Sequence, residues 1–349
     1  MIHTLSVSMN FSRHHYEELA DLLGIDENTS TVTKDYSSIG FREIRLLKTI
    51  NQKIHYYGIE IKLNPKVLIT GREDIGIISE KDINLLCEKF NNKMKNDIAP
   101  GMDLLEFNNW TCKRIDYTTD IKVNDVKSYI RLFKKGDKPS SFKIDLKEAG
   151  SLYLKSNSVI INFYDKEDEQ LKKVLRKDEN LSDSRKEAIK DILRLEVQCL
   201  PSKVNSIKRK KKFKSKSVIK FLSKDISEGI ILSYYDATVG IGDYYTLEEA
   251  KKIIFKCNYT ERLKNSLISA MQLVAQSRSI WRAREQFVKG VIIKNTNPYV
   301  KLKGTKATFN NYIKLLSNLG INAVAIPREW GINYMPNIRK YILNKFIND

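Results

Sequence analysis

The chain has 349 residues, of which 42% are hydrophobic and 30% charged; this composition predicts a soluble folded protein and argues against a disordered one. The formal net charge of +19, from 61 Lys and Arg against 42 Asp and Glu, indicates a polyanionic partner, first nucleic acid and second an anionic membrane surface. No stretch reaches the roughly 20 apolar residues of a membrane span, no anchor motif stands out, and four cysteines without a C-x-x-C pair argue against zinc and disulfides. We therefore expect a cytoplasmic protein that binds nucleic acid and no membrane.

The first 205 or so residues are rich in strand-like runs. Two of these runs meet at residues 156–158 (Ser-Asn-Ser), which is typical of a β-hairpin. Helical spacing at 79–96 and at 123–133 interrupts the strands, and the mixture predicts an α+β domain built on a sheet. The expected strands are LSVSM (5–9), IHYYGIEIKL (54–63), CKRIDYTTDIKV (112–123), SLYLKSN (151–157), SVIINFYDK (158–166) and DILRLEVQCL (191–200).

A basic run follows at residues 208–216, where seven of nine side chains are cationic. It is either a solvated linker or a segment that follows the phosphates of a nucleic acid, and both interpretations are open. In either case it marks a domain boundary. The expected division is a sheet domain at 1–205, a basic linker at 206–225 and a C-terminal domain at 226–349.

The C-terminal part has a mainly helical pattern. Thr246 and Glu249 form a capping box ahead of a helical run. Helical periodicity continues through 260–289 and returns at 308–319, and a short strand is expected at 321–326 (INAVAI).

Three of the expected strands each carry one carboxylate between apolar neighbours: Glu60, Asp116 and Glu196. Arg114 and Arg194 stand two positions before an acid and so share its face of the strand. If these strands are neighbours, the acids converge and either share protons or hold a divalent cation, for which oxygen ligands suit Mg²⁺ or Mn²⁺. The alternative is a solvated face of an antiparallel sheet.

The end of the expected hairpin is strongly charged, from Tyr164 to Glu169 (YDKEDE). One interpretation is a strand-to-helix exit, with acids in the first helical turn where they suit the helix dipole. The other makes Lys166 a fixed cation for a phosphate and Glu169 a metal ligand or an acid–base group.

Taken in order, six stretches resemble the phage and plasmid replication initiators of the gene II/X family, typified by the replication endonuclease of filamentous phages. The R-x-acid strands and the Y-x-K-x-x-E pattern are also similar to those of rolling-circle plasmid initiators from Gram-positive bacteria. The stretches are MIHTLSVSM (1–9), GIEIKLNPKVL (58–68), RID (114–116), Tyr164-x-Lys166-x-x-Glu169, RLE (194–196) and KATFNNYIKLLSNLGINAVAIPR (306–328).

The resemblance implies an enzyme that nicks one strand of double-stranded origin DNA. A tyrosine attacks the phosphodiester while Mg²⁺ or Mn²⁺ polarises the phosphate, which leaves a 5′-phosphotyrosyl enzyme and a 3′-OH that primes replication. It also implies an antiparallel-sheet nuclease domain of a degenerate HUH, rolling-circle-initiator-like type, followed by a helical domain that grips DNA. The nicked single strand and a host helicase are the further partners expected.

The same resemblance assigns roles to residues of this chain. Lys166 and Glu169 are expected as catalytic helpers. The expected metal ligands are Glu60, Asp116 and Glu196, with Gln198 as a weaker fourth. The expected DNA contacts are Arg114, Arg194, Lys208, Arg209, Lys210, Lys211, Lys212 and Lys214.

The chain departs from these families in two respects. Its four histidines contain no His-hydrophobic-His pair. In the filamentous-phage enzyme the nucleophile would fall between residues 165 and 195, where this chain has no tyrosine. In the plasmid initiators it closely follows the last acidic strand, whereas the first tyrosine after Glu196 here is Tyr234. The remaining candidates are Tyr234, Tyr235, Tyr244 and Tyr245, which could equally be structural tyrosines.

A non-enzymatic interpretation therefore stays open: an origin- or operator-binding protein on the same scaffold that does not cut. A third interpretation, an RNA-binding protein, has no aromatic RNA-binding motif to support it.

Overall fold

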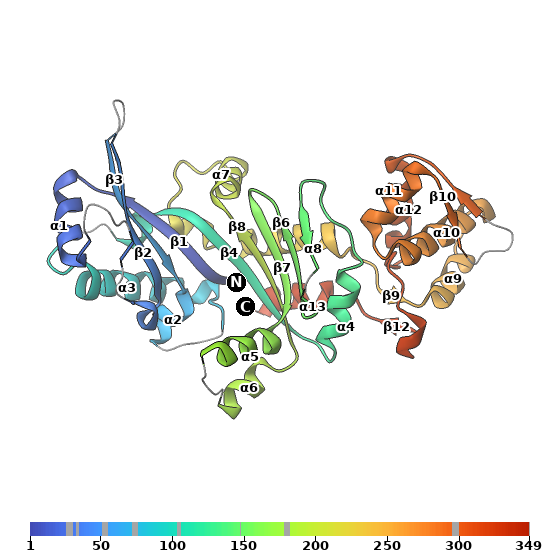
Figure 1. Cartoon of the computed structure of the whole chain (residues 1–349), viewed down its shortest axis with the longest axis horizontal. Helices are drawn as coiled ribbons and strands as arrows, with labels where there is room; N and C mark the ends of the chain where they lie inside the picture. The colour runs from blue at the N-terminus through green and yellow to red at the C-terminus, as the bar shows by residue number, and fades with distance from the viewer. Residues whose placement is uncertain are drawn as a thin grey trace.

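The computed structural model describes residues 1–25, 31–32, 35–50, 55–71, 76–102, 106–146, 148–177, 182–294 and 300–348. Within these residues an eight-stranded sheet forms the centre of the molecule, in the order β2-β3-β1-β4-β8-β7-β6-β5 (Figure 1). Every neighbouring pair is antiparallel, which confirms the α+β architecture expected from the sequence. The strands are β1 (Ile2–Asn10), β2 (Phe41–Ile50), β3 (His55–Leu63), β4 (Thr111–Lys122), β5 (Lys143–Asp145), β6 (Ser151–Lys155), β7 (Val159–Asp165) and β8 (Ile192–Cys199).

The expected hairpin is present as β6 and β7. Its turn is closed by Ser156, whose hydroxyl accepts a hydrogen bond from the Val159 amide at 3.0 Å. Sequence patterning did not predict β2 or β5. Both lie at the ends of the sheet, where a strand is paired on one side within the described residues and fewer side chains need to be apolar.

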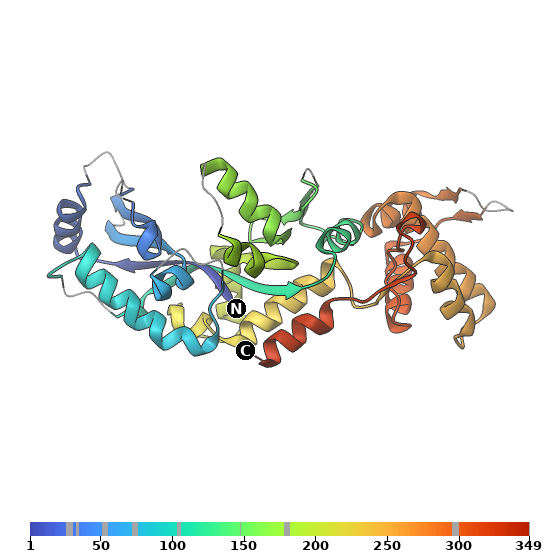
Figure 2. The same ribbon diagram turned by 90° about the horizontal axis from the view of Figure 1, so that it is seen from below.

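Alternation of side chains gives the sheet one apolar and one polar face. Helices α7 (Pro201–Lys210), α8 (Lys224–Thr238) and α13 (Arg339–Asn348) pack on the central strands β4 and β8. Figure 2 shows α8 and α13 on one side of the strands and α5 (Lys166–Lys177) with α6 (Asp183–Ile189) on the other. Leu195 and Val197 of β8 are buried, as the period-two pattern requires.

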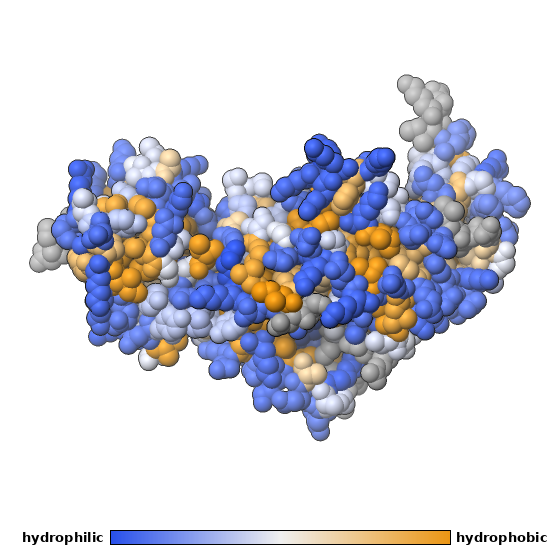
Figure 3. Space-filling view, turned by 180° about the vertical axis from the view of Figure 1, so that it is seen from behind, coloured by the Kyte–Doolittle hydropathy of each residue, from blue (hydrophilic) through white to orange (hydrophobic). Residues whose placement is uncertain are grey.

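The outer surface behind the sheet carries hydrophobic patches separated by hydrophilic side chains (Figure 3). None of the described helices combines the length and hydrophobicity that a membrane crossing requires. The other elements around the sheet are α1 (Arg13–Leu23), α2 (Pro65–Thr70), α3 (Ile83–Lys93) and α4 (Val126–Phe133).

The C-terminal part forms a mainly helical lobe to one side of the sheet (Figure 1). Thr246 caps its first helix as expected, because its hydroxyl accepts from the Glu249 amide. The lobe contains α9 (Leu247–Lys256), α10 (Glu261–Ser277), α11 (Ile280–Lys289), α12 (Lys306–Asn318), the hairpin β10 (Val291–Ile293) with β11 (Val300–Leu302), and the short pair β9 (Tyr244–Tyr245) with β12 (Tyr334–Met335).

The strand expected at 321–326 is not formed. Ile321 and Ile326 make isolated bridges with Asp243 and Thr246. Between them the Asn322 side chain accepts from the Val324 amide at 3.0 Å and donates to the Val239 carbonyl at 2.8 Å. An asparagine that bonds its own neighbouring backbone bends the chain, so the ladder is interrupted.

The packing divides the chain differently from the limits expected at 205 and 225. Helix α13 and most of α8 belong to the segment 226–349, yet both helices pack on the sheet. Part of the basic run is the last turn of α7, and the Lys216 carbonyl accepts from the Cys112 amide of β4 at 2.8 Å. The run is thus tied to the sheet domain at both ends.

Candidate active site

The polar face of the sheet holds a pocket of about 480 Å³ beside α5. Helix α5 starts directly after β7, because the Asp165 carboxylate accepts from the amides of Glu167 at 3.0 Å and Asp168 at 3.3 Å. This places the acids of the first helical turn at the favourable end of the helix dipole. The carboxylates lining the pocket are Asp145, Glu148, Asp165, Asp168, Glu169 and Glu196.

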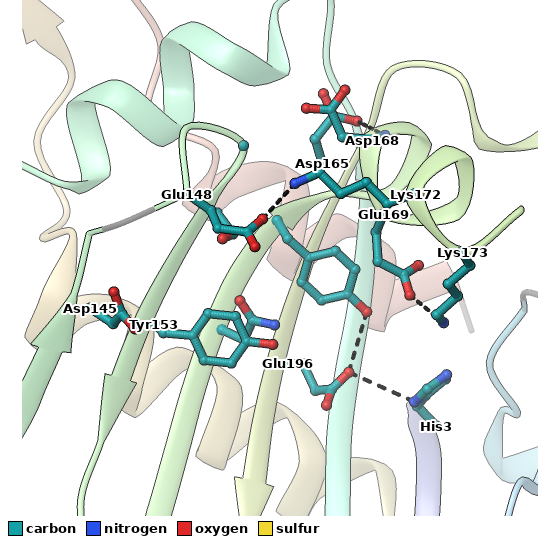
Figure 4. A pocket seen from close by; sticks show the side chains of 14 residues that line it. His3, Asp145, Glu148, Tyr153, Asp165, Asp168, Glu169, Lys172, Lys173 and Glu196 are labelled. Atoms are coloured by element: carbon teal, nitrogen blue, oxygen red, sulfur yellow. Dashed lines mark hydrogen bonds and ion pairs between the residues drawn. The ribbon is translucent and has the colours of Figure 1, made fainter. Parts of the chain in front are cut away.

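Three pocket residues lie in one row across neighbouring strands. Glu196 on β8 pairs with Asn162 on β7, and Asn162 pairs with Tyr153 on β6. Figure 4 shows the Tyr153 ring extending toward Glu196. The Oδ1 atom of Asn162 is buried and has no hydrogen-bond partner among the described residues. The Tyr153 side chain is accessible, with 41% of the residue exposed.

Glu196 is the centre of the pocket's polar contacts, and it is only 6% exposed. Its Oε1 accepts from Gln198 Nε2 at 2.6 Å, and its Oε2 accepts from the Tyr164 hydroxyl at 3.4 Å. The Nδ1 of His3 lies 3.7 Å from Oε2. Burial, followed by the charge of Arg194, lowers the pKa of His3 well below its ordinary value, so this imidazole is neutral near pH 7.

Asp116 lies next to this group on β4, but its charge is already paired. Arg114 donates to both carboxylate oxygens at 2.8 Å and to Gln198 Oε1 at 2.7 Å. Burial nevertheless raises the pKa of Asp116 to about 6, and the negative charge of Glu196 adds to the rise. A chain of hydrogen bonds therefore runs from Asp116 through Arg114 and Gln198 to Glu196.

The arginine of β8 pairs with an acid of the neighbouring strand, whereas Arg114 of β4 pairs with an acid of its own strand. Arg194 donates through Nε and NH2 to the two oxygens of Asp120 on β4, at 2.6 Å each. The Arg194 side chain is fully buried. Arg114 and Arg194 were both expected to contact DNA, but both are engaged in ion pairs within the sheet.

The three acids expected to converge do not all meet. Glu60 on β3 stands opposite Ser8 on β1 and Arg45 on β2, and β1 separates β3 from β4. Among the described residues, no three His, Cys, Asp or Glu side chains gather closely enough to hold a metal ion. The structure thus brings Asp116, Glu196 and Gln198 together and leaves Glu60 apart.

The Lys and Glu of the Y-x-K-x-x-E pattern form an ion pair between a buried lysine and a half-buried glutamate. Lys166 is 3% exposed and its Nζ lies 2.9 Å from Glu169 Oε2. Burial, and then the charge of Arg194, lowers the pKa of Lys166 to about 8. Burial alone would raise the pKa of Glu169, but Lys166 and Lys173 outweigh it and lower this pKa to about 2. Glu169 and Lys173 line the pocket, together with Lys172, whereas the buried Lys166 is not part of the lining.

The four tyrosines proposed from the sequence lie away from the pocket. Tyr235 of α8 is fully buried and donates to Asn337 Oδ1 at 2.7 Å, and Tyr244 of β9 is also buried. Burial raises the pKa of both well above the ordinary value. Tyr234 lies under the Lys203 ammonium, 4.9 Å from the ring centre, and Tyr245 packs on Tyr334 at 5.3 Å.

Of the described residues, Tyr153 and Tyr164 are the tyrosines that line the pocket. Sequence reasoning missed Tyr153, His3 and Asn162, because it searched where the families place their motifs. A usable signal was present: Tyr153 occupies the outward position of the alternating run SLYLK, next to the charged hairpin exit.

Comparison with protein families gives a match over the first two thirds or so of the chain. The model of the N-terminal part of the gene II replication-associated protein covers residues 1–221, which include the whole sheet and the pocket. Comparison with curated proteins and with solved structures gives no match.

Proposed function

The chain belongs to the gene II family of phage replication-associated proteins, and we propose that it starts rolling-circle replication by nicking one strand of its origin in this pocket. The observation that carries the proposal is the row of Tyr153, Asn162 and Glu196 in the pocket, with neutral His3 beside Glu196. A pocket that holds an accessible phenol, a carboxylate and a neutral imidazole is suited to covalent phosphoryl transfer.

Tyr153 is the nucleophile in this proposal. Its oxygen attacks phosphorus, the bond from phosphorus to the 3′ oxygen breaks, and the products are a 5′-phosphotyrosyl protein and a free 3′-OH. The phenol proton passes to a base, a role that we give to Glu196, whose charge acts on the Tyr153 phenol, and the leaving 3′ oxygen takes up a proton. Tyr164 is less suitable, because it is 7% exposed and its hydroxyl is directed to Glu196.

The excess of negative charge in the pocket favours the binding of a cation. Burial raises the pKa of Tyr153, and the negative charges of Glu196, Glu169 and Glu148 raise it further. The same acids repel a phosphodiester, and the cations of Lys172 and Lys173 are outnumbered by the six carboxylates that line the pocket. A bound divalent cation would offset this charge, polarise the phosphate and favour ionisation of the phenol.

The ligand set expected from the sequence does not fit such a cation. Both oxygens of Asp116 accept from Arg114, and Gln198 is engaged through both its oxygen and its nitrogen. Glu196, His3 and Asn162 offer a better donor set, because all three line the pocket and Asp116 and Gln198 do not. Carboxylate, amide and imidazole donors suit Mn²⁺ or Mg²⁺.

The experiment is incubation of the intact chain with supercoiled DNA of its own replicon and Mn²⁺. We expect nicked circles and a protein covalently bound to a 5′ DNA end, with the adduct on the peptide containing Tyr153. Origin binding without any adduct in Mn²⁺ or Mg²⁺ would favour the non-cutting origin-binding protein. The nicked single strand and a host helicase would be later partners of the nicking protein.

A further inference from the structure

The C-terminal lobe has a charge opposite to that of the pocket. Residues 247–320 contain fourteen Lys and Arg against four Asp and Glu, whereas carboxylates dominate the pocket lining. Phosphates of a duplex are attracted to the first kind of surface and repelled by the second. The lobe is therefore the better place to hold duplex DNA outside the reaction site.

Two helices of the lobe form a tight helix–turn–helix. Helix α10 ends at Ser277 and α11 begins at Ile280, and Arg278 between them takes a left-handed conformation with φ 61°. Ser279 caps α11 through the Arg282 amide. The Ser277 hydroxyl donates to Gln286 Oε1 at 2.7 Å and so ties the second helix to the first. Such a unit presents its second helix as a rigid rod.

The outward face of α11 carries Arg282, Glu285 and Lys289, all exposed. Their spacing of i, i+3 and i+7 places them on one stripe, whereas the Gln286 side chain between them is engaged by Ser277. The inward face is fixed by Phe287, whose ring packs on those of Phe309 at 5.4 Å and Tyr312 at 6.1 Å.

The cations of α11 are divided between the two faces. Arg284 turns inward to bind Asp137 and, at 2.7 Å, Asn310. The inward contacts of α11 therefore fix the helix on the lobe, and the charged ends of the outward side chains remain exposed.

The hairpin β10–β11 follows α11 and lies beside the turn. The Gln276 side chain donates to the Ile292 carbonyl at 3.2 Å and accepts from the Lys294 amide at 2.9 Å. Lys294, Lys301 and Lys303 are exposed on this hairpin. Exposed lysines beside a helix suit contacts to the phosphates that flank a groove.

We propose that the α11 stripe reads base edges in the major groove of duplex DNA while the hairpin lysines contact the adjacent phosphates. Arg and Glu are side chains that pair with guanine and cytosine edges respectively. Glu285 is the informative member, because an acid on a basic surface weakens non-specific binding to phosphates. It has a use there if it accepts a hydrogen bond from a base. The inference takes DNA as partner from the proposed function but does not depend on nicking.

The test is selection from a pool of duplexes with a randomised centre, using the intact chain in EDTA so that no strand is cut. Wild type should enrich a sequence motif. Arg282→Ala should weaken binding to that motif by about tenfold and relax one position of it. Glu285→Ala should lose preference at another position while binding random duplex as well as wild type or better. Arg262→Ala is the matched control, since Arg262 is exposed at the far end of α10, and it should enrich the wild-type motif.

Two results would overturn the inference: no motif with the wild-type chain, or the unchanged motif and affinity with both stripe variants, shown to be folded by their thermal melts. The outcome is separable from the fate of the nicking proposal. Tyr153→Phe should enrich the wild-type motif even though it forms no adduct, and a failure of nicking leaves the selection result intact.

Discussion

Tyr153 on β6 and Glu196 on β8 lie in one row across the sheet, because Asn162 on β7 pairs with both. The phenol that the proposal uses as nucleophile and the carboxylate placed to take its proton are thus fixed by strand register rather than by a loop. Register errors of one residue would turn both side chains to the apolar face, so the row is a rigid feature of the fold.

Tyr153→Phe should abolish the covalent adduct and the nicking of supercoiled DNA, since the ring remains but the attacking oxygen is gone. Tyr245→Phe is the control, because Tyr245 is half-buried outside the pocket, and it should nick like wild type. Gel assays of nicked circles and of labelled 5′ adduct measure both. An adduct that persists in Tyr153→Phe would assign the nucleophile elsewhere.

Glu196→Gln should slow nicking by about a hundredfold or more, because the base and a proposed metal ligand are lost together. Glu60→Gln should leave the rate unchanged, since Glu60 stands on β3 away from the pocket. Single-turnover rates at saturating Mn²⁺ compare the two. An equal loss of nicking rate in the two variants would support the ligand set expected from the sequence, which includes Glu60.

Asp116→Asn should lower the free energy of unfolding by about 3 kcal/mol, because it leaves Arg114 without its charge partner inside the sheet. Its effect on nicking per folded molecule should be smaller than that of Glu196→Gln, since Asp116 acts on Glu196 through Arg114 and Gln198. Urea melts give the first quantity. The double variant Arg114→Met with Asp116→Leu should recover most of the stability; a double variant as unstable as the single one would contradict this account.

Lys166 should make stability depend on pH between about 8 and 10.5. Its folded pKa of about 8 is below the ordinary 10.5, so in this window the unfolded chain binds more protons and stability rises with pH, by up to about 1.4 kcal/mol per unit. Lys166→Met lacks this rise. Urea melts of both proteins from pH 7 to pH 10 measure this. The free energy of unfolding of Lys166→Met minus that of wild type should fall as pH increases. Parallel curves would show that Lys166 keeps its proton throughout.

The basic run should contribute to the salt dependence of DNA binding. Lys210, Lys211 and Lys212 are exposed at the end of α7 and just beyond it, and each phosphate contact adds about 0.9 to the slope of log affinity against log salt. Changing all three to Gln should make the slope shallower by about two to three units. Fluorescence anisotropy with a random duplex measures it, and an unchanged slope would show that the run does not touch the DNA.

The local pattern of the sequence was sufficient for the fold class and for most central strands. Alternation predicted β1, β3, β4 and the β6–β7 hairpin, because one face of each packs on a core while the other stays polar. It was insufficient at the sheet ends, where β2 and β5 need fewer apolar residues, and at 321–326, where Asn322 bends the backbone.

For the site, the sequence determined which residue types were available: single acids within apolar strands, a charged hairpin exit and a strongly basic chain. The tertiary structure decided which of them meet. Strand order puts β1 between β3 and β4, which keeps Glu60 from Asp116, and register puts Tyr153 in the row of Glu196. Hydrogen bonding then engages Asp116 with Arg114 and leaves Glu196 facing the pocket. Alternation along one strand assigns a side chain to a face, but the pairing of strands far apart in the chain decides its neighbours, and that pairing is set by long-range contacts that no local pattern encodes.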